Sequence, residues 1–193
     1  ILTHPAMNTQ PFQPSVGETK PPDNEGYDIA IQDSLRREDI KVVVEDGPDM
    51  KLRLAEITAA ANPLLAAASP LLCALAQMPR ELAPAFVEHY RALLEREVRR
   101  YQTLCDQANL RREHVLAVRY CLCTSLDEAA NNTTWGRRGV WAGKSLLVTF
   151  HGESEGGIKL FQIIGRLASS FQEHSDVLEI IYHILGLGFE GRY

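Results

Sequence analysis

Apolar residues recur three or four residues apart along most of the chain beyond about Lys51, which is the spacing of one face of an α-helix. The longest such stripe leaves the charged residues Glu88, Arg91, Glu95 and Arg99 on the other faces. It consists of Leu82, Phe86, Tyr90, Leu93, Leu94, Tyr101 and Leu104. This pattern predicts one long amphipathic helix over 82–104.

Three further segments carry the same pattern. Val115 to Ala129 predicts a helix that ends near Asn131, after a polar loop in which Asn109 can cap. A third stripe covers 158–171, and residues 176–185 are apolar almost all round, so we expect the last helix to be central. The core positions expected from these stripes include Leu122, Phe161, Ile164, Ile181 and Ile184.

An uncharged segment, 57–79, has the length of a membrane span but not its composition. It contains Pro63 and Pro70 and is rich in alanine, so we expect a buried helix pair with a break. A turn-rich stretch, 132–143, precedes a short apolar segment, 145–150, that is either helical or extended. Because strands and helices do not alternate and no repeat is visible, the predicted class is all-α.

The first 50 residues differ in composition from the rest. They hold 10 acidic and 4 basic residues, and five prolines fall within the first 26 positions. We expect 1–50 to be a Pro-rich acidic leader, mostly disordered, and 51–193 to be the helical domain. A β-like run at Ile40–Val44 leaves the structure of 27–50 open. The helical part is close to neutral, so nucleic acid is not a predicted partner.

The residues that resemble chemical motifs do not predict a cofactor or a metal. Four cysteines are too few for a disulfide scaffold, and Cys121 and Cys123 fall on different faces of a helix. Gly186 to Gly191 spells GxGxxG, but a helix rather than a strand precedes it. The run 139–145 is one residue too short between its glycines for a phosphate loop. We therefore expect core thiols and a helix-ending glycine segment.

An enzymatic reading is the alternative from another class. A helical hydrolase or metal-dependent enzyme would use His114, His151, Glu153 and Asp127. His151 and Glu153, with Glu155 close by, are more simply a solvated patch after an apolar segment. No nucleophile, base and oxyanion arrangement can be assembled from the sequence, so no catalytic residue is predicted.

Two adjacent carboxylates are more informative. Asp127 and Glu128 interrupt an apolar helical face, next to a turn that contains Trp135 and Trp141. One interpretation is a solvated pair or a cap-type contact. The other is a carboxylate pair held at a groove to meet a partner, with one side chain facing the groove and the other supporting the turn.

Seven short motifs, in the same order along 51–193, resemble the DotU/IcmH/TssL family of bacterial secretion proteins. They are Asn62-Pro63-Leu64-Leu65 with Pro70-Leu71-Leu72, Tyr120 to Glu128, Thr134-Trp135-Gly136, Ser145-Leu146-Leu147, Phe150 to Glu153, Gly156-Gly157, and Leu187 to Tyr193. One departure is Thr134, where many relatives carry proline before the Trp-Gly pair.

The resemblance implies a cytoplasmic domain of two packed three-helix bundles that form a hook, followed by one membrane helix that would begin after Tyr193. It implies a structural, non-enzymatic component of the type VI secretion membrane complex at the bacterial inner membrane, facing the cytoplasm. The equivalent component of a type IVB system is the alternative. The partners implied are an IcmF-like inner-membrane protein, baseplate proteins and a second copy of the chain. The residues assigned to partner binding are Asp127, Glu128, Trp135, Gly136 and Trp141, with Phe189, Glu190 and Tyr193 at the membrane-proximal end.

Overall fold

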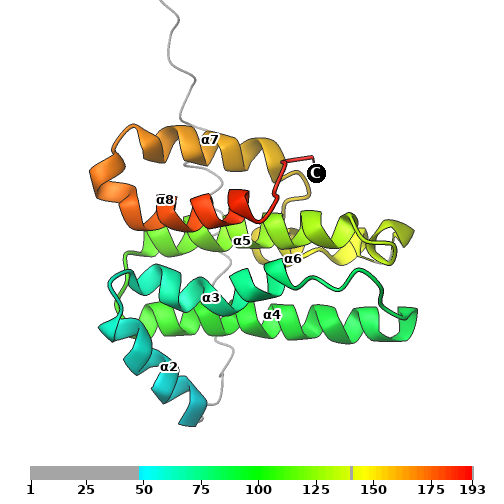
Figure 1. Ribbon diagram of the computed structural model, residues 1–193, viewed down its shortest axis with the longest axis horizontal. Helices are drawn as coiled ribbons and strands as arrows, with labels where there is room; N and C mark the ends of the chain where they lie inside the picture. The colour runs from blue at the N-terminus through cyan, green and yellow to red at the C-terminus, as the bar shows by residue number, and fades with distance from the viewer. Residues whose placement is uncertain (1–47, 140, 193) are drawn as a thin grey trace, which may run out of the picture.

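The computed structural model describes residues 48–139 and 141–192, and that part of the chain folds into helices without strands (Figure 1). The all-α class is therefore confirmed. Most of the expected leader, with Ile40–Val44, and the terminal Tyr193 lie outside the described residues. The α-helices are α2 (Pro48–Ala59), α3 (Pro63–Ala76), α4 (Pro84–Gln107), α5 (Arg112–Asn131), α6 (Leu146–His151), α7 (Gly157–Ala168) and α8 (Phe171–Gly186), with 3-10 turns η1 (Gly136–Arg138) and η2 (Ala142–Lys144).

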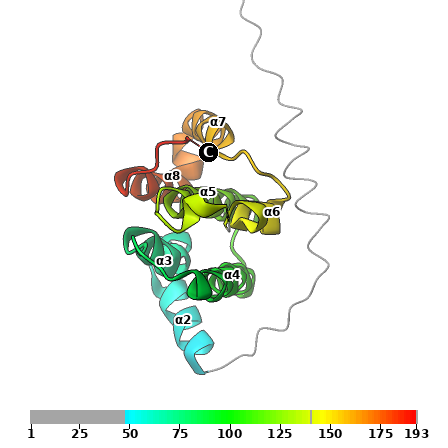
Figure 2. The same cartoon turned by 90° about the vertical axis from the view of Figure 1, so that its right-hand side faces the viewer.

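Helix α5 runs through the middle of the molecule. Helices α2, α3 and α4 lie on one side of it and α7 and α8 on the other, with the short α6 alongside (Figures 1 and 2). Every residue from His114 to Glu128 is buried. We expected the last helix to occupy that central place, and this prediction was wrong. Helix α8 buries one face, through Val177, Ile180, Ile181 and Ile184, while Tyr182 on the opposite side is exposed.

Helix α4 is amphipathic as predicted, but its buried face is rotated from the predicted one. The buried arc passes through Val87, Leu94 and Val98, and Arg91 lies on it with only 3% of its surface exposed. Arg91 forms ion pairs with Glu88 and Glu95 of the same helix, which compensate part of the cost of its burial. Phe86, expected on the buried stripe, is exposed.

The same kind of rotation affects α7. Its buried residues are Gly157, Leu160, Ile163 and Leu167, so Ile164 is only half-buried. Phe161, expected in the core, is 47% exposed and lies at the edge of the buried face. The other expected core positions, Leu122, Ile181 and Ile184, are buried as predicted.

The uncharged segment forms the end of α2 and all of α3, with a break at 60–62 as expected. Asn62 caps α3 by accepting a hydrogen bond from the Leu65 amide, and its side-chain nitrogen donates to Glu179 of α8. Pro63 fills the first turn, where no amide is needed. Among the described residues, none of the helices combines the length and apolar character of a membrane span. Helix α2 covers Pro48–Ala59, and Met50 is buried, so the described helices include residues before the expected boundary at Lys51.

Candidate partner-binding site

Asp127 lies near the end of α5 and fastens the start of α6. Its carboxylate accepts hydrogen bonds from the Leu146 amide at 2.9 Å, the Leu147 amide at 2.8 Å and the Trp141 indole at 2.8 Å. Ser145 accepts a further bond from the Val148 amide. The first amides of a helix have no partner within it, so Asp127 supplies from another helix what a cap residue normally supplies.

The titration of Asp127 reflects two opposed effects. Burial raises the pKa of this carboxyl above its ordinary value, because the charged form loses water. The bonds from Leu147, Leu146 and Trp141 favour the charged form and lower the pKa in part. The net direction is upward. Without these donors the pKa of Asp127 would lie higher still.

Glu128, the next residue, fastens a different part of the chain. Its two carboxylate oxygens accept hydrogen bonds from the backbone amides of Glu190 and Arg192, each at 2.6 Å. Only 2% of its surface is exposed. These amides belong to the segment that follows α8, so Glu128 ties the last described residues to the central helix.

The two carboxylates therefore do not form the exposed pair at a groove that was one interpretation of the sequence. With Asp127 at 7% exposure and Glu128 at 2%, both point into the protein, and each has backbone amides as partners. Asp127 supports the turn that contains Trp141 by accepting a hydrogen bond from its indole, the role that we expected of one of the two carboxylates. Adjacent positions on a helix differ by about 100°, which directs the two side chains to different sides of α5. Their part in partner binding stays a prediction.

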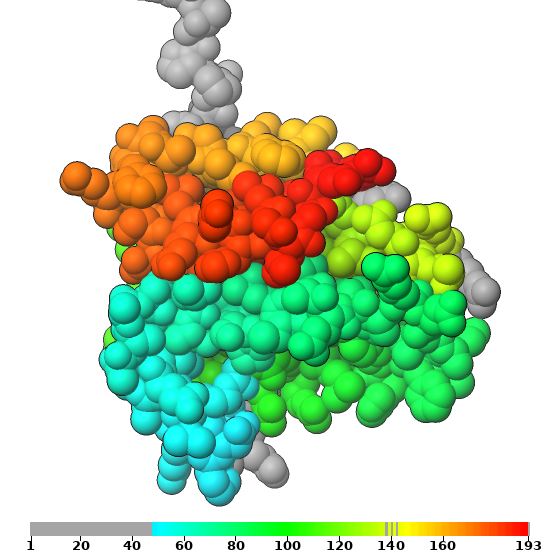
Figure 3. All heavy atoms as spheres, in the orientation of Figure 1, coloured from blue at the N-terminus to red at the C-terminus, as the bar shows by residue number. Residues whose placement is uncertain are grey.

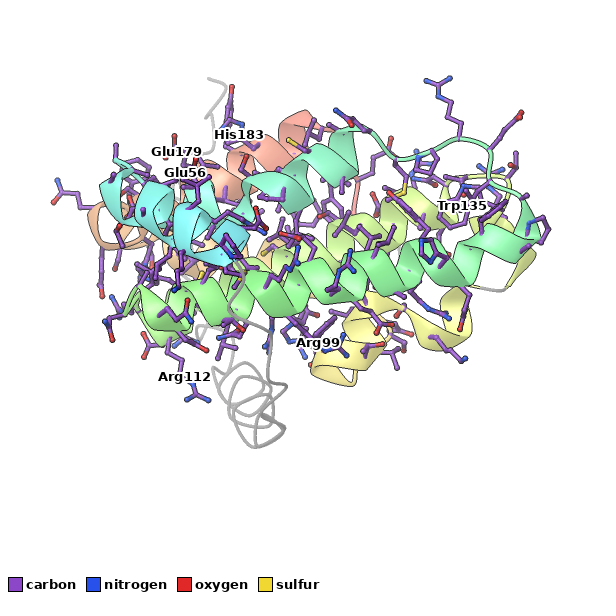
Figure 4. All side chains as sticks on the ribbon, turned by 90° about the horizontal axis from the view of Figure 1, so that it is seen from below. Glu56, Arg99, Arg112, Trp135, Glu179 and His183 are labelled. Carbon is purple, nitrogen blue, oxygen red and sulfur yellow. The ribbon has the colours of Figure 1, made fainter. Side chains whose placement is uncertain are left out.

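The turn after α5 packs around two tryptophans. The Trp135 indole donates to the Pro79 carbonyl at 2.8 Å and meets Trp141 edge-on, with ring centroids 5.5 Å apart. Gly136 lies so close to α5 that a Cβ there would be 2.0 Å from the Ala130 carbonyl oxygen. Only glycine fits this approach. Figure 4 shows Trp135 at one end of the molecule, between the loop after α3 and α4.

The terminal residues assigned to the membrane-proximal end are partly packed. Phe189 is buried and its ring centroid lies 6.1 Å from that of Phe161. The Glu190 side chain is exposed and pairs with Arg192. Gly191 has φ +75°, and a Cβ there would be 2.5 Å from a Phe161 ring carbon. The sequence indicated these glycines as a helix ending, but not that the Glu128 carboxylate, 62 residues before Glu190, would accept the Glu190 amide.

Two clefts open on either side of this terminal segment. One, of about 480 Å³, lies between the end of α3, the end of α5 and residues 187–189. The other, of about 500 Å³, lies between α5, the start of α6, the start of α7 and residues 191–192. Figure 3 shows the terminal segment on the surface beside α5, where the red and yellow-green atoms meet. Glu128 lines the first cleft and Asp127 the second.

The residues of the enzymatic alternative do not converge. His114 lies at the start of α5 and hydrogen-bonds His174 at 2.9 Å, some 20 Å from Asp127 along the helix by the rise per residue. Burial and the nearby Arg111 lower the pKa of His114. Within the described residues, no group of three or more His, Cys, Asp or Glu side chains is placed to hold a metal ion.

His151 and Glu153 lie closer together but serve the packing of α6. The Tyr120 hydroxyl donates to Glu153 at 2.9 Å, and Lys159 forms an ion pair with it at 2.7 Å. His151 is buried against the Tyr120 ring, and burial lowers its pKa to about 3. The expected solvated patch is therefore wrong for His151, which is a neutral core side chain, while Glu155 is exposed as expected.

A family model described as "Type VI secretion system protein DotU" matches residues 63–193. Among solved structures, the chain is similar to TssL from Vibrio cholerae, with 34% sequence identity and a TM-score of 0.61. That match covers 68% of this chain and 82% of the other. No curated protein sequence matches the chain.

Proposed function

Because the chain belongs to the type VI secretion DotU family, we propose that it joins an IcmF-like inner-membrane protein to the cytoplasmic baseplate. Membership makes it a component of the type VI secretion membrane complex, in a family associated with the inner membrane. The proposal adds its two partners, its self-association, and the orientation of the helical domain toward the cytoplasm. Its role is structural rather than enzymatic.

The observation that carries the proposal is the pair of clefts on either side of the terminal segment. Their walls contain residues of the motifs that resemble the family, among them Glu128, Thr134 and Gly156. Asp127 and Glu128 there accept hydrogen bonds from backbone amides rather than being free for proton transfer. Such a surface suits recognition of a polypeptide better than turnover of a small molecule.

In this proposal Asp127 and Glu128 do not contact partners themselves but position the segments that line the two clefts. Asp127 keeps α6 and Trp141 in place beside the second cleft, and Glu128 keeps the terminal segment between the two clefts. Trp135 and Gly136 fix the turn beside the first cleft. Baseplate proteins bind at the clefts, and the IcmF-like protein binds nearer the membrane.

A pull-down from membranes tests the proposal. A tagged full-length protein, cross-linked in cells that carry a type VI system, should recover an IcmF-like protein and baseplate proteins. Thr134→Arg at the rim of the first cleft should reduce baseplate recovery, and Ser69→Arg on the exposed face of α3 is the matched control. Recovery of type IVB components instead would favour the alternative, and recovery of neither partner would contradict the proposal.

A further inference from the structure

Two histidine rings join the first turn of α5 to the first turn of α8, residues 171–174. The His114 Nε2 and His174 Nδ1 atoms are 2.9 Å apart, and the rings meet edge-on with their centroids 5.1 Å apart. His114 is buried, and the His174 side chain is only 16% exposed. The contact therefore lies in a place from which water is largely excluded.

The contact requires one ring nitrogen that donates and one that accepts. A neutral imidazole has one nitrogen of each kind, so two neutral rings can form it. One added proton is also compatible, because a charged ring can donate to a neutral one. Two added protons are not, because every ring nitrogen then carries a hydrogen and no acceptor remains. The closed contact can therefore hold one proton beyond the neutral pair, but not two.

The surroundings of the two rings differ. The other ring nitrogen of His174, Nε2, lies 3.9 Å from the Glu173 carboxylate, so a charge on this ring faces the opposite charge. His114 is in the less favourable place: burial, followed by the charges of Arg111 and His174, lowers its pKa. It also lies at the N-terminal end of α5, where the helix dipole disfavours a cation. A second proton would thus enter a buried ring beside a charged one.

Charged residues of four helices lie at this end of the molecule, where α4 and α7 end and α5 and α8 begin (Figure 1). They are Arg111, Arg112 and Glu113 at the start of α5, Glu173, Asp176 and Glu179 in α8, Asp106 near the end of α4 and Arg166 near the end of α7. Glu113 and Asp176 raise the pKa of His114 in part, but the net direction is downward. Arg111 pairs with both Glu113 and Glu173. These carboxylates therefore do not offset the cost of a second proton.

The first turn of α8 has few other attachments. Its N-cap residue, Ser170, makes no side-chain capping bond, and the first buried residue of the helix is Val177. Phe171 is mostly exposed and adds little burial. Farther along, α8 is held by its buried face and by the bond from Asn62 to Glu179. Loss of the histidine contact would release the first turn while the rest of α8 stays packed.

We propose that the His114–His174 contact is a pH-sensitive latch, which releases the first turn of α8 from α5 when both rings are protonated. In the released state both rings reach water, and each can take its own proton. Acid therefore favours release, and the population of the released state rises about tenfold per pH unit below about pH 6.5 for one extra proton. The latch is at the opposite end of α5 from the two clefts, so it does not depend on the proposed function.

Amide hydrogen exchange on the full chain, at pH 7 and pH 5, gives the first test. Protection factors, which correct for the intrinsic effect of pH on exchange, should fall at least tenfold at His174 and at 175–177 through a local opening. The amides of Ile180 and Ile184 should stay better protected. Nitrogen NMR of the rings should show that His114 takes up its proton as this protection is lost. Unchanged protection, exchange of the first turn only through global unfolding, or a charged His114 with the turn still protected would each overturn the proposal.

Two variants that keep the hydrogen bond without the second charge give the second test. His174→Asn carries an amide group near the position of Nδ1, and His114→Gln carries one near the position of Nε2, and an amide group can donate or accept at either pH. Each variant should remove most of the fall in protection between pH 7 and pH 5. His183→Asn, at an exposed histidine in the last turn of α8, is the matched control and should behave as the wild type does. A fall of the wild-type size in both latch variants, or its loss in the control, would overturn the proposal.

Discussion

The two ends of helix α5 differ in the charged side chains that connect them to the rest of the protein, which are exposed at one end and buried at the other. At the first end, Arg111 pairs with Glu113 at 2.8 Å and with Glu173 at 2.5 Å, and all three side chains are largely exposed. At the far end, Asp127 and Glu128 are buried and take backbone amides. Figure 4 shows the separation, with Arg112 and Trp135 at opposite ends of the molecule.

The difference matters because burial sets what a charge contributes. An exposed ion pair exchanges water for a partner and gains about 0 to 1 kcal/mol. The loss in the free energy of unfolding is several times larger when a buried carboxylate loses its donors or when buried donors lose their carboxylate. The end of α5 that carries the clefts and the family motifs is thus the more tightly specified one, and substitutions there should have the larger effects.

The largest effect is expected for Asp127→Ala. The substitution leaves the Leu146 and Leu147 amides and the Trp141 indole buried without their acceptor. We expect a loss of about 3 to 5 kcal/mol in the free energy of unfolding, measured by chemical denaturation. Glu113→Ala at the opposite end of the same helix is the control and should change little. A loss below about 1 kcal/mol for Asp127→Ala would contradict the capping role.

Gly136→Ala should have the next largest effect. The new Cβ would overlap the Ala130 carbonyl, which is backbone and cannot rotate away, so the turn or the end of α5 must shift. A cost of about 1 to 3 kcal/mol is typical of such overpacking. Gly143→Ala tests the same chemistry with space around the Cβ, and it should be close to neutral. Equal effects for the two substitutions would show that the close approach is not what requires glycine.

The pH dependence of stability should distinguish His151 from the other buried side chains. Because its folded pKa of about 3 is below its ordinary value, the unfolded chain takes up a proton first as the pH falls. Stability from this group is complete above about pH 6.5 and is lost progressively toward pH 3. Relative to His151→Gln, the wild type should lose about 1 to 2 kcal/mol between pH 7 and pH 5. Parallel pH profiles for the two proteins would contradict a buried neutral His151.

Asp127 would titrate in the opposite sense. Its pKa is raised, so the folded chain takes up a proton first and this group gains stability as the pH falls through its folded pKa. For that reason the free energy of unfolding of the wild type should be compared with that of His151→Gln at each pH. The wild-type pH profile alone would combine the effects of His151 and Asp127.

The sequence predicted which segments are helices better than which faces they bury. Periodic apolar spacing marked the bodies of α4, α5, α7 and α8, because an amphipathic helix requires it. It failed on the phase of α4 and α7. Phe86 and Phe161 fit a stripe as well as the residues that are buried, and Arg91 lies on the buried arc because Glu88 and Glu95 pair with it. Periodicity alone does not reveal such pairing.

The sequence drew attention to the residues at the end of α5 but did not predict their geometry. The interruption of an apolar face by Asp127 and Glu128 was visible, and so was the glycine-rich terminal segment. Glu128 joins α5 to this segment by accepting two backbone hydrogen bonds, across 62 and 64 residues of sequence. No local sequence pattern encodes contacts of that range. A carboxylate inside an apolar helix has to find donors, and backbone amides can come from any part of the chain.

The smallest effect is expected for Arg111→Ala at the exposed end of α5. The Arg111 guanidinium, just before α5, bridges Glu113 of α5 and Glu173 of α8, yet each partner has water as an alternative. Chemical denaturation at physiological salt should show no change beyond error, and any small loss seen at low salt should disappear as salt is added. A loss that persists at high salt would mean that the Arg111–Glu173 contact positions α8 by packing rather than by charge. Arg111→Met, which keeps most of the apolar stem without the charge, separates those two causes. If Arg111→Met recovered the stability that Arg111→Ala loses, the first end of α5 would depend on burial as the far end does. The contrast between the two ends would then no longer hold.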